Sequence, residues 1–503
     1  MPLLLGIEVA TTAARSVVVA DDGGVRGTAA ADYPLAVPRP GWAEQDPEAW
    51  WRAAGESVRG ALMRSGAAPQ DIAAVGLTGQ MHSLVLLDAA GRVLRPAILW
   101  NDQRTAEECA EITRRVGPAR LLAITRNPAL PGFTAPKILW VRRHEPAVYA
   151  RTASVLLPKD YVRFRLTGAR ATEVSDASGT GLLDVPHRTW SEEVLRALEV
   201  PMAWLPGCAE SPELTAVVAC DGEAATGLRA GTPVAGGGGD QAAQAVGTGI
   251  VRSGPVSVTI GTSGVVFASL DGPAMDAQAR THTFCHAVPG RWHVMGVMLS
   301  AGGALRWLRD AIAPGADYGE LTGEAGAAPP GAGHLVFLPY LSGERTPYPD
   351  PIARGAFVGL SLAHGRGHLV RAVMEGVAFG LRDSLAILHE MGLRPTEVRL
   401  SGGGSRSAVW RQIVADVLGT EVVTMQVAEG AAYGAALLAG VGAGVFPSVE
   451  AACEATLRPA TRTEPVARNR AVYEDLYGVY RALYPALRPA FAQLAGAARC
   501  RAD

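Results

Sequence analysis

Residues 234–246 read V-A-G-G-G-G-D-Q-A-A-Q-A-V, which predicts an apolar strand end, a glycine turn and the start of a helix. Glycines let a ligand approach the backbone, and the free N–H groups of a helix start make that end of the turn positive. We therefore expect the carboxylate of Asp240 to face a ligand bound at this turn. Capping the helix is the commoner role of such an aspartate. Four glycines are hard to explain by a cap alone, because each raises the entropy cost of folding.

A similar strand, glycine turn and helix is predicted at residues 398–418, V-R-L-S-G-G-G-S-R-S-A-V-W-R-Q-I-V-A-D-V-L. This second stretch has no acid at the place of Asp240. We interpret the two stretches as related turns that carry different side chains. Two related turns with different side chains predict two different ligands.

The predicted strands indicate an internal duplication. Each half opens with a strand, a hydroxyl-bearing turn and another strand, at residues 3–9, 10–14 and 15–20 and again at residues 256–260, 261–264 and 265–270, and a third strand is predicted at residues 25–33. Each half later carries one of the two glycine turns. This repeat favours two α/β domains that face each other. Glycines at residues 247–254 place the boundary, which gives predicted domains 1–247 and 248–503.

The two hydroxyl-bearing turns are candidates for phosphate binding. Gly261, Thr262, Ser263 and Gly264 combine two hydroxyls with free backbone N–H groups, the kind of concavity that holds phosphate oxygens. Taken alone, such a turn is more often an ordinary hairpin. Thr11 and Thr12 stand at the matching place in the first half. The pair of turns therefore predicts a phosphate clamp.

Composition limits the class of protein. The chain has 503 residues, of which 48% are hydrophobic and 19% charged, as expected for a globular protein of two or three domains. A net charge of -2 argues against nucleic acid as a main partner. Lys137 and Lys159 are the only lysines, and neither lies in the Gly-Lys-Ser/Thr context that a Walker A loop requires. The G-x-G-x-x-G dinucleotide fingerprint is also missing from the sequence.

Several features predict a cytoplasmic protein. The start of the sequence lacks the basic region of a signal peptide. The longest run without charged or strongly polar side chains, residues 431–446, is shorter than the roughly 18 residues of a membrane span and predicts a buried helix and turn. Six cysteines without paired spacing are typical of a reduced cytosolic enzyme; they are Cys109, Cys208, Cys220, Cys285, Cys453 and Cys500.

Two helices are predicted with particular clarity. The first covers residues 46–64, with Asp46 as cap and Pro47 in the first helical position. The last covers residues 471–483, where Tyr473, Leu476 and Tyr480 recur every three or four residues. We expect this last helix to pack on the second domain.

Polar motifs at two strand ends are candidates for binding a small polyol. Residues 79–83, G-Q-M-H-S, and residues 100–104, W-N-D-Q-R, each follow an apolar run. Their polar groups beside Met and Trp suit a ligand whose hydroxyls lie over an apolar wall. Taken separately, His82 is more often a structural histidine. His282, Cys285, His286 and His293 resemble a metal cluster, but along a strand they are too spread for one zinc ion, so no metal is assigned to them.

These motifs resemble those of the FGGY carbohydrate kinases over nearly the whole chain. One family signature is similar to residues 132–141, G-F-T-A-P-K-I-L-W-V, and a second to residues 355–376, which begin G-A-F-V-G-L. Within the family, G-Q-M-H, L-W-N-D-x-R and G-G-G-D resemble the xylulokinase branch. The resemblance implies an α/β fold of two duplicated actin-like, hexokinase-like (ribonuclease H-like) ATPase domains with a cleft between them.

The resemblance also implies roles for single residues. Asp240 corresponds to the catalytic base that accepts the proton of the sugar hydroxyl. The expected sugar contacts are Met81, His82, Asn101, Asp102 and Gln241, and the expected ATP contacts are Thr11, Thr12, Arg15, Gly261, Thr262, Gly302, Gly403 and Gly404. The implied reaction is phosphorylation of D-xylulose at its 5-hydroxyl with ATP and Mg²⁺. Relatives are commonly dimers, so a homodimer is one expected state.

Two departures from the family pattern lie in the first phosphate turn. The family usually has an aspartate and, two residues later, a glycine, where this chain has Glu8 and Ala10. Glu8 would reach a hydrated Mg²⁺ through a longer side chain, and Mg²⁺ demands near-octahedral geometry. The methyl group of Ala10 could crowd a phosphate. We expect an active enzyme; the alternatives are a kinase for another polyol or ketose, or a weak sugar-binding pseudokinase.

Overall fold

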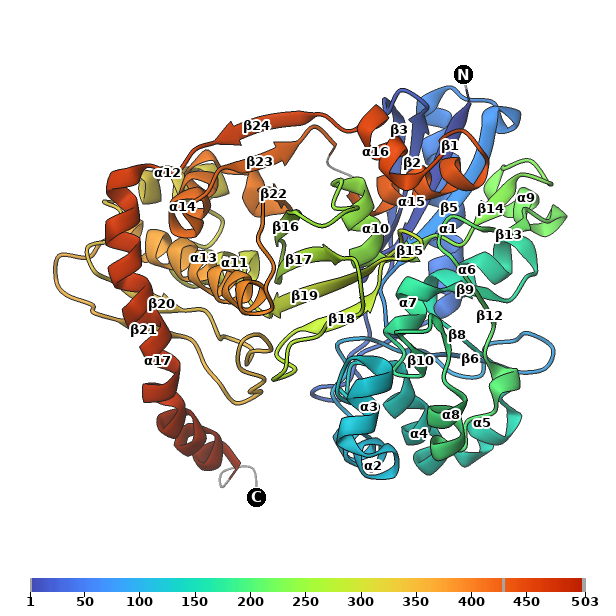
Figure 1. Cartoon of the computed structure of the whole chain (residues 1–503), viewed down its shortest axis with the longest axis horizontal. Coiled ribbons are helices and arrows are strands. Elements are labelled where there is room, and N and C mark those ends of the chain that lie inside the picture. The colour runs from blue at the N-terminus through green and yellow to red at the C-terminus, as the bar shows by residue number, and fades with distance from the viewer. Residues whose placement is uncertain (1, 428–429, 500–503) are drawn as a thin grey trace.

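The computed structural model describes residues 2–427 and 430–499, which form two α/β halves with a pocket between them (Figure 1). A mixed seven-stranded sheet lies at the centre of each half. The first sheet has the order β13 (Leu214–Val217), β14 (Pro233–Ala235), β5 (Ile72–Gly79), β1 (Leu3–Val9), β2 (Ala13–Ala20) and β3 (Val25–Asp32), with β15 (Gly238–Gly239) also paired to β5. The second has the order β18 (His282–Cys285), β19 (Trp292–Met298), β17 (Gly264–Leu270), β16 (Pro255–Ile260), β22 (Glu397–Ser401), β23 (Val422–Met425) and β24 (Pro459–Thr463).

The two sheets confirm the internal duplication. In the first, β1, β2 and β3 are antiparallel, β5 and β14 run parallel to β1, and β13 is an antiparallel edge. The second repeats this order with β16, β17 and β19, then β22 and β23, and β24 as the antiparallel edge. The predicted fold class, two duplicated actin-like ATPase domains, is therefore confirmed.

The predicted kinship of the two glycine turns is wrong. The turn at residues 398–418 follows β22, which is the counterpart of β5. The turn at residues 234–246 follows β14 and β15, whose counterpart is β23. The true counterpart of residues 398–418 is thus the polar motif at residues 79–83. The sequence could not show this, because strand order depends on pairing between distant segments.

Helices cover both faces of the first sheet, since successive residues of an apolar strand point to opposite faces. Leu5 of β1 packs in one core cluster with Trp50 and Val58 of α1 (Pro47–Ser65). Leu4 packs in another with α10 (Asp240–Gly247), α15 (Gly430–Gly442) and α16 (Val449–Thr456). The prediction of α1 is confirmed, because Asp46 Oδ1 accepts the Glu48 N–H at 3.0 Å.

The apolar helix α15 belongs to the second half of the chain but lies on the first sheet. A Cβ atom on Gly6 of β1 would overlap the carbonyl oxygen of Ala432, and one on Gly76 of β5 would overlap that of Ala435. Only glycine lets the helix approach the strands this closely. The prediction of a buried helix here is confirmed. Because α15 and α16 join the first-half core, the division at residue 247 remains a prediction.

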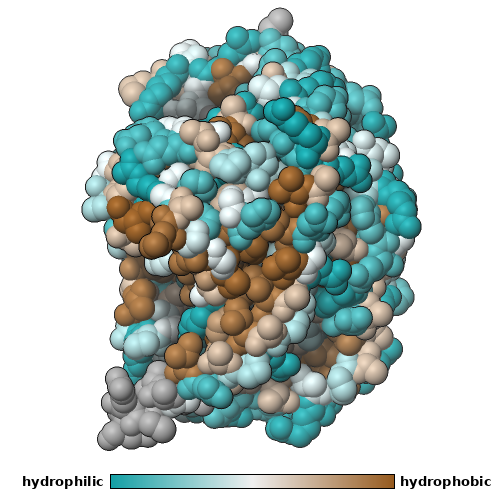
Figure 2. All heavy atoms as spheres, turned by 90° about the vertical axis from the view of Figure 1, so that its left-hand side faces the viewer, coloured by the Kyte–Doolittle hydropathy of each residue, from teal (hydrophilic) through white to brown (hydrophobic). Residues whose placement is uncertain are grey.

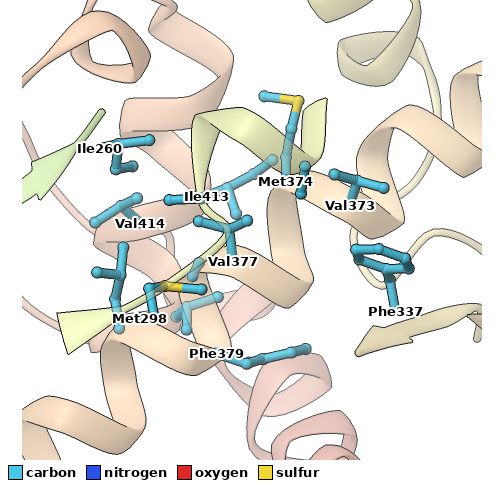
Figure 3. Packing of buried hydrophobic residues seen from close by; sticks show 14 of the residues in the cluster. Ile260, Met298, Phe337, Val373, Met374, Val377, Phe379, Ile413 and Val414 are labelled. Atoms are coloured by element: carbon cyan, nitrogen blue, oxygen red, sulfur yellow. The ribbon is translucent and has the colours of Figure 1, made fainter. Parts of the chain in front are cut away.

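The core of the second half supports the strand that leads to the second hydroxyl turn. Figure 3 shows Ile260 at the end of β16 beside Ile413 and Val414 of α14 (Ala408–Leu418) and Val377 of α13 (Arg366–Glu390). The cluster also includes α11 (Gly302–Ile312), α12 (Tyr318–Ala327) and α17 (Ala467–Arg499). Packing of this kind holds the end of β16 in place.

The last helix is longer than the sequence pattern predicts. Tyr473, Leu476 and Tyr480 pack in the second-half core, which confirms where the helix lies. However, α17 continues to Arg499 through Pro485 and Pro489, well past residue 483. Figure 2 shows the face that carries α17, where apolar side chains gather in a band.

The remaining elements of the first half lie mainly between β5 and β13 in the sequence, and α2, α3, α4, α5 and α8 among them lie below the sheet in Figure 1. They are β4 (Glu44–Gln45), η1 (Pro69–Asp71), β6 (Val85–Leu87), β7 (Ala97–Ile98), α2 (Ala106–Val116), α3 (Pro118–Thr125), α4 (Thr134–His144), α5 (Pro146–Arg151), β8 (Ser154–Leu156), α6 (Pro158–Thr167), β9 (Ala171–Glu173), α7 (Val174–Ser178), β10 (Leu183–Asp184), β11 (Thr189–Trp190), α8 (Glu192–Leu198), η2 (Met202–Trp204), β12 (Gly207–Ala209) and α9 (Cys220–Thr226). The second half adds β20 (Val336–Leu338), β21 (Ala356–Val358) and η3 (Gly403–Arg406).

Two further observations concern the whole chain. Within residues 2–427 and 430–499, none of the helices combines the length and apolar character of a membrane span. The five cysteines that the structure describes have free thiols, and Cys500 lies outside the described residues.

Candidate active site

Asp240 occupies the first position of α10, directly after the N-cap residue Gly239. It is therefore not the cap, and that alternative reading of the residue is wrong. Burial and, second, the charge of Glu8 raise the pKa of Asp240 to about 7, although hydrogen bonds from Gln241 lower it. A carboxylate with this pKa can accept a proton near neutral pH, as a general base must.

The glycines before Asp240 are required by close contacts with the end of β5. Gly237 has a φ of +76°, and a Cβ atom there would overlap the carbonyl oxygen of Leu77. A Cβ atom on Gly239 would lie 2.9 Å from Cγ of Met81. The glycine turn therefore brings Asp240 beside the G-Q-M-H-S motif.

His82 has a defined tautomer. Its Nδ1 donates a hydrogen bond to the carbonyl oxygen of Gly179 at 2.6 Å. Burial lowers the pKa of His82 to about 3, so the ring is neutral at physiological pH. With the proton on Nδ1, Nε2 is left as an acceptor. A sugar hydroxyl is a suitable donor to it.

The family signature at residues 132–141 holds the backbone of His82. The carbonyl oxygen of His82 accepts hydrogen bonds from Thr134 Oγ1 and Lys137 Nζ, both at 2.9 Å. Lys137 also donates to the carbonyl oxygen of Gly132 at 2.6 Å. The histidine keeps a left-handed backbone with a φ of +71°, which is uncommon for a residue other than glycine. These contacts stabilise that conformation.

An aromatic wall completes the sugar side of the site and joins the two halves. The ring of His82 stacks on Phe133 with centroids 4.7 Å apart, and Phe133 lies 6.0 Å from Phe284 of β18. Phe284 in turn stacks on His282 at 5.8 Å. His282 Nδ1 donates to Asn127 Oδ1 at 3.2 Å. The wall therefore contains side chains from both halves.

The other two histidines of the second half have partners of their own. His286 Nε2 donates to the carbonyl oxygen of Ile250 at 2.9 Å. His293 stacks on Phe267 with centroids 4.3 Å apart. In the part of the chain that the structure describes, no group of three or more His, Cys, Asp or Glu residues is placed to hold a metal ion.

A pocket of about 1180 Å³ lies between the halves, larger than most small-molecule sites and large enough for a nucleotide. Its lining brings together the predicted residues Glu8, Arg15, Gly261, Thr262 and Gly403. Gln244 also lines it, one helical turn after Asp240 and thus roughly 6 Å further along α10. The candidate base therefore stands between this pocket and His82.

Four predicted ATP contacts do not line the pocket, and their role in binding ATP stays a prediction. The Thr11 hydroxyl accepts a hydrogen bond from Trp100 Nε1 at 3.1 Å, which ties the first turn to the W-N-D-Q-R motif, and Thr12 is exposed beside it. Gly302 N–H donates to the carbonyl oxygen of Gly261 at 2.7 Å and so supports the second turn from behind. A Cβ atom on Gly404 would lie 2.5 Å from Cγ2 of Ile260, so this glycine serves close packing.

Comparison with known proteins identifies the family to which the chain belongs. The model of the N-terminal domain of the FGGY family of carbohydrate kinases matches residues 3–247, and that of its C-terminal domain matches residues 256–443. The chain belongs to the FGGY family of carbohydrate kinases. Members of this family are ATP-dependent sugar kinases, and the predicted resemblance is confirmed.

Three FGGY kinases among its relatives show how far the similarity extends. The chain is 43% identical to the xylulose kinase of Escherichia coli (strain K12), over 84% of this chain and 86% of that one. It is 39% identical to the xylulose kinase of Bacillus subtilis (strain 168), over 96% and 97%. The crystal structure of xylulose kinase from Rhodospirillum rubrum superposes with a TM-score of 0.88 and 34% identity, over 97% of this chain and 100% of that one.

One predicted sugar contact of this FGGY kinase is not available to a sugar. The side chain of Asp102 is fully buried and accepts hydrogen bonds from the N–H groups of Ala43 and Arg104. The Arg104 guanidinium binds both carboxylate oxygens, at 2.6 and 2.9 Å. Asp102 thus anchors Arg104 behind the site. Asn101 is half-buried, and its Oδ1 is enclosed without a hydrogen-bond partner among the described residues, so its role as a sugar contact stays a prediction.

Some residues around the site could not be recognised from the sequence. Ser175 Oγ accepts the N–H of Gly239 at 3.0 Å, from a helix whose motif carries no chemical signature. Arg345 lies in the loop after β20, and its charge lowers the pKa of both His82 and His282, so it faces the sugar side from the second half. The G-E-R-T-P motif around it is the signal that could have identified this residue.

Proposed function

We propose that this FGGY kinase transfers the γ-phosphoryl group of ATP to the 5-hydroxyl of D-xylulose, which yields D-xylulose 5-phosphate and ADP. The relatives at 43% and 39% identity are xylulose kinases and match this chain over most of its length. The observation that carries the proposal is the position of Asp240. This carboxylate, with its pKa raised to about 7, lies between the His82 motif and a pocket of nucleotide size.

The chemistry assigned to Asp240 follows from this position. The oxygen of the 5-hydroxyl forms a bond to the γ-phosphorus, and the bond from that phosphorus to the β,γ-bridging oxygen breaks. The hydroxyl proton passes to the Asp240 carboxylate, and ADP leaves with the bridging oxygen. Nε2 of His82 accepts a hydrogen bond from another hydroxyl of the ketose, which orients the sugar. The turn at Gly261 and Thr262 binds phosphate oxygens of ATP.

The residues at the site fit a magnesium ion. Mg²⁺ in kinase sites usually keeps several waters and binds through one or two carboxylates together with substrate phosphates. Glu8 lines the pocket, and its charge acts on Asp240, so two carboxylates stand where the phosphates would meet the sugar. Glu8 would hold the hydrated ion, which supplies positive charge to the transferring phosphoryl group.

Hydrogen bonds connect the two halves at the wall of the pocket. Gln244 Nε2 of α10 donates to Ser401 Oγ of β22 at 3.2 Å, and Ser401 Oγ lies 2.9 Å from Thr259 Oγ1. The pocket wall thus includes a hydrogen-bonded chain across the halves. Closure along this wall would exclude water and so limit hydrolysis of ATP.

The test is Mg²⁺-dependent ADP release from ATP with D-xylulose, D-ribulose, glycerol or no sugar. We expect release to be stimulated chiefly by D-xylulose. Stimulation by another of these sugars would support the alternative substrate class, because the fold alone does not fix the substrate. If folded protein shows no stimulation of ADP release by any of these sugars, the result would favour a pseudokinase, the alternative suggested by Glu8 and Ala10.

A further inference from the structure

The short helix α7 (Val174–Ser178) and the residue after it contact two parts of the site. Near its start, Ser175 Oγ accepts the N–H of Gly239, the residue directly before Asp240, at 3.0 Å. After its end, the carbonyl oxygen of Gly179 accepts the proton of His82 Nδ1 at 2.6 Å. One short segment therefore contacts both the turn before the candidate base, Asp240, and the candidate sugar-binding residue, His82.

We propose that Ser175 is a positioning residue for the phosphoryl transfer, which fixes Asp240 through the N–H of Gly239. This inference rests on the proposed role of Asp240 as the base. The glycine turn cannot fix itself, because glycine has the widest conformational freedom of all residues. An external acceptor on the last glycine restricts the backbone immediately before the carboxylate.

A buried charge cluster holds α7 in place. Glu173 caps the helix, since its carboxylate accepts the N–H groups of Ser175 at 2.7 Å and Asp176 at 2.9 Å. Lys159 Nζ lies 3.5 Å from Glu173, 3.2 Å from Asp176 and 2.6 Å from Asp160, and all four side chains are inaccessible to solvent. Breaking a buried pair costs about 3–5 kcal/mol, so this cluster makes α7 a rigid support.

The far end of α7 is tied to the second half. The N–H of Cys285 in β18 donates to Ser178 Oγ at 3.0 Å. Phe284, one residue earlier, belongs to the aromatic wall that faces His82. The α7 segment therefore contacts the turn before the candidate base, the candidate sugar contact His82 and the second half of the molecule.

The size of the expected effect follows from positioning. A displacement of about 1 Å at a reacting group can cost on the order of 100-fold in rate. Ser175 is not among the residues that line the nucleotide pocket, so binding of ATP should not depend on it. Loss of its hydroxyl should therefore lower kcat and leave the KM for ATP unchanged.

The experiment compares Ser175→Thr with Ser175→Val, because threonine and valine have the same shape and differ only by a hydroxyl in place of a methyl group. Ser175→Ala is a third variant, which removes the hydroxyl. Thr226→Ala is the matched control, because Thr226 is also buried and donates to Gly222 at 2.6 Å, in a helix away from the site. Asp240→Asn tests the base itself. For each protein we would measure kcat, the KM of ATP and of D-xylulose, and the midpoint of thermal unfolding.

We expect Ser175→Val and Ser175→Ala to lose at least about 10-fold in kcat with the KM of ATP within twofold. Ser175→Thr should restore most of the rate, and Thr226→Ala should keep it. Equal kcat for the Thr and Val variants, or a loss in Thr226→Ala as large as in Ser175→Ala, would overturn the inference. Full activity of Asp240→Asn would instead overturn the proposed base, so the two failures can be told apart.

Discussion

Arg15 of β2 lies directly opposite Glu8 of β1, and its Nη1 is 3.7 Å from Glu8 Oε2. Burial raises the pKa of Glu8, and the charge of Arg15 acts against that rise. Arg15 thus favours the ionised form of the residue that departs from the family pattern. Both side chains line the nucleotide pocket. Arg15 therefore offsets part of the effect of burial on this longer carboxylate, at the pocket where it would bind Mg²⁺.

Replacing Glu8 and Ala10 with the family residues tests whether the departures matter. We expect the double variant Glu8→Asp, Ala10→Gly to change kcat by less than about threefold, because Glu8 already places a carboxylate at the pocket beside Arg15. Glu8→Gln should raise the Mg²⁺ concentration needed for half-maximal rate by 10-fold or more, since the ligand loses its charge. Steady-state kinetics over a Mg²⁺ series measures both. A gain of 100-fold or more in the double variant would instead identify the natural chain as a weak kinase.

The pH dependence of the rate should report Asp240. Its pKa is raised to about 7 and the base must be ionised, so kcat should fall as pH drops below about 7 and level off above it. The charge of Glu8 contributes to that rise. In Glu8→Gln the acid limb should therefore move to lower pH. A pH profile whose acid limb stays in place in this variant would show that the two carboxylates do not interact.

The Asp240 carboxylate should lower the free energy of unfolding at neutral pH. Its folded-state pKa of about 7 lies above the ordinary value of 3.8, so the folded protein binds more protons between these pH values and loses stability as pH rises through them. Asp240→Asn should stabilise the fold at pH 8 by on the order of 1 kcal/mol, a value discounted because the residue is not fully buried. At pH 4 the gain should vanish. Thermal unfolding at both pH values checks this, and equal midpoints at pH 8 would speak against the raised pKa.

The revised role of Asp102 also has a direct consequence. Asp102→Asn removes one of the two carboxylates that pair with the buried Arg104 guanidinium and leaves Glu44 at 2.8 Å, which should destabilise the fold by about 2 kcal/mol. The KM for sugar at a temperature where the variant is folded should stay within about threefold. Denaturant unfolding and saturation kinetics provide the two values. A selective rise in the sugar KM without loss of stability would restore Asp102 as a sugar contact.

The sequence predicts those parts of the site that depend on local signals. The glycines at residues 236–239 and the single acid after them were sufficient to locate Asp240, because a tight turn onto a helix has a local pattern. The hydroxyl turns at Thr11 and Thr262 likewise indicated the duplication, which the strand order of the two sheets confirms.

Parts that depend on distant contacts could not be predicted. Asp102 is a polar residue after a strand, as a sugar contact would be, but the N–H group that captures it belongs to Ala43, 59 residues earlier. The second glycine turn resembles the first in composition, yet it follows a strand with a different place in its sheet. Both errors arise because contacts between segments that are distant in the sequence cannot be deduced from the residues of either segment alone.

The most direct test of the central claim is transfer of the γ-phosphoryl group in a single turnover. Wild type and Asp240→Asn would be mixed with γ-³²P-labelled ATP, Mg²⁺ and D-xylulose, and the labelled products separated. We predict that wild type places the label on the 5-oxygen of D-xylulose and that Asp240→Asn is slower by at least about 100-fold. Label found only in inorganic phosphate, or equal rates in the two proteins, would contradict the account.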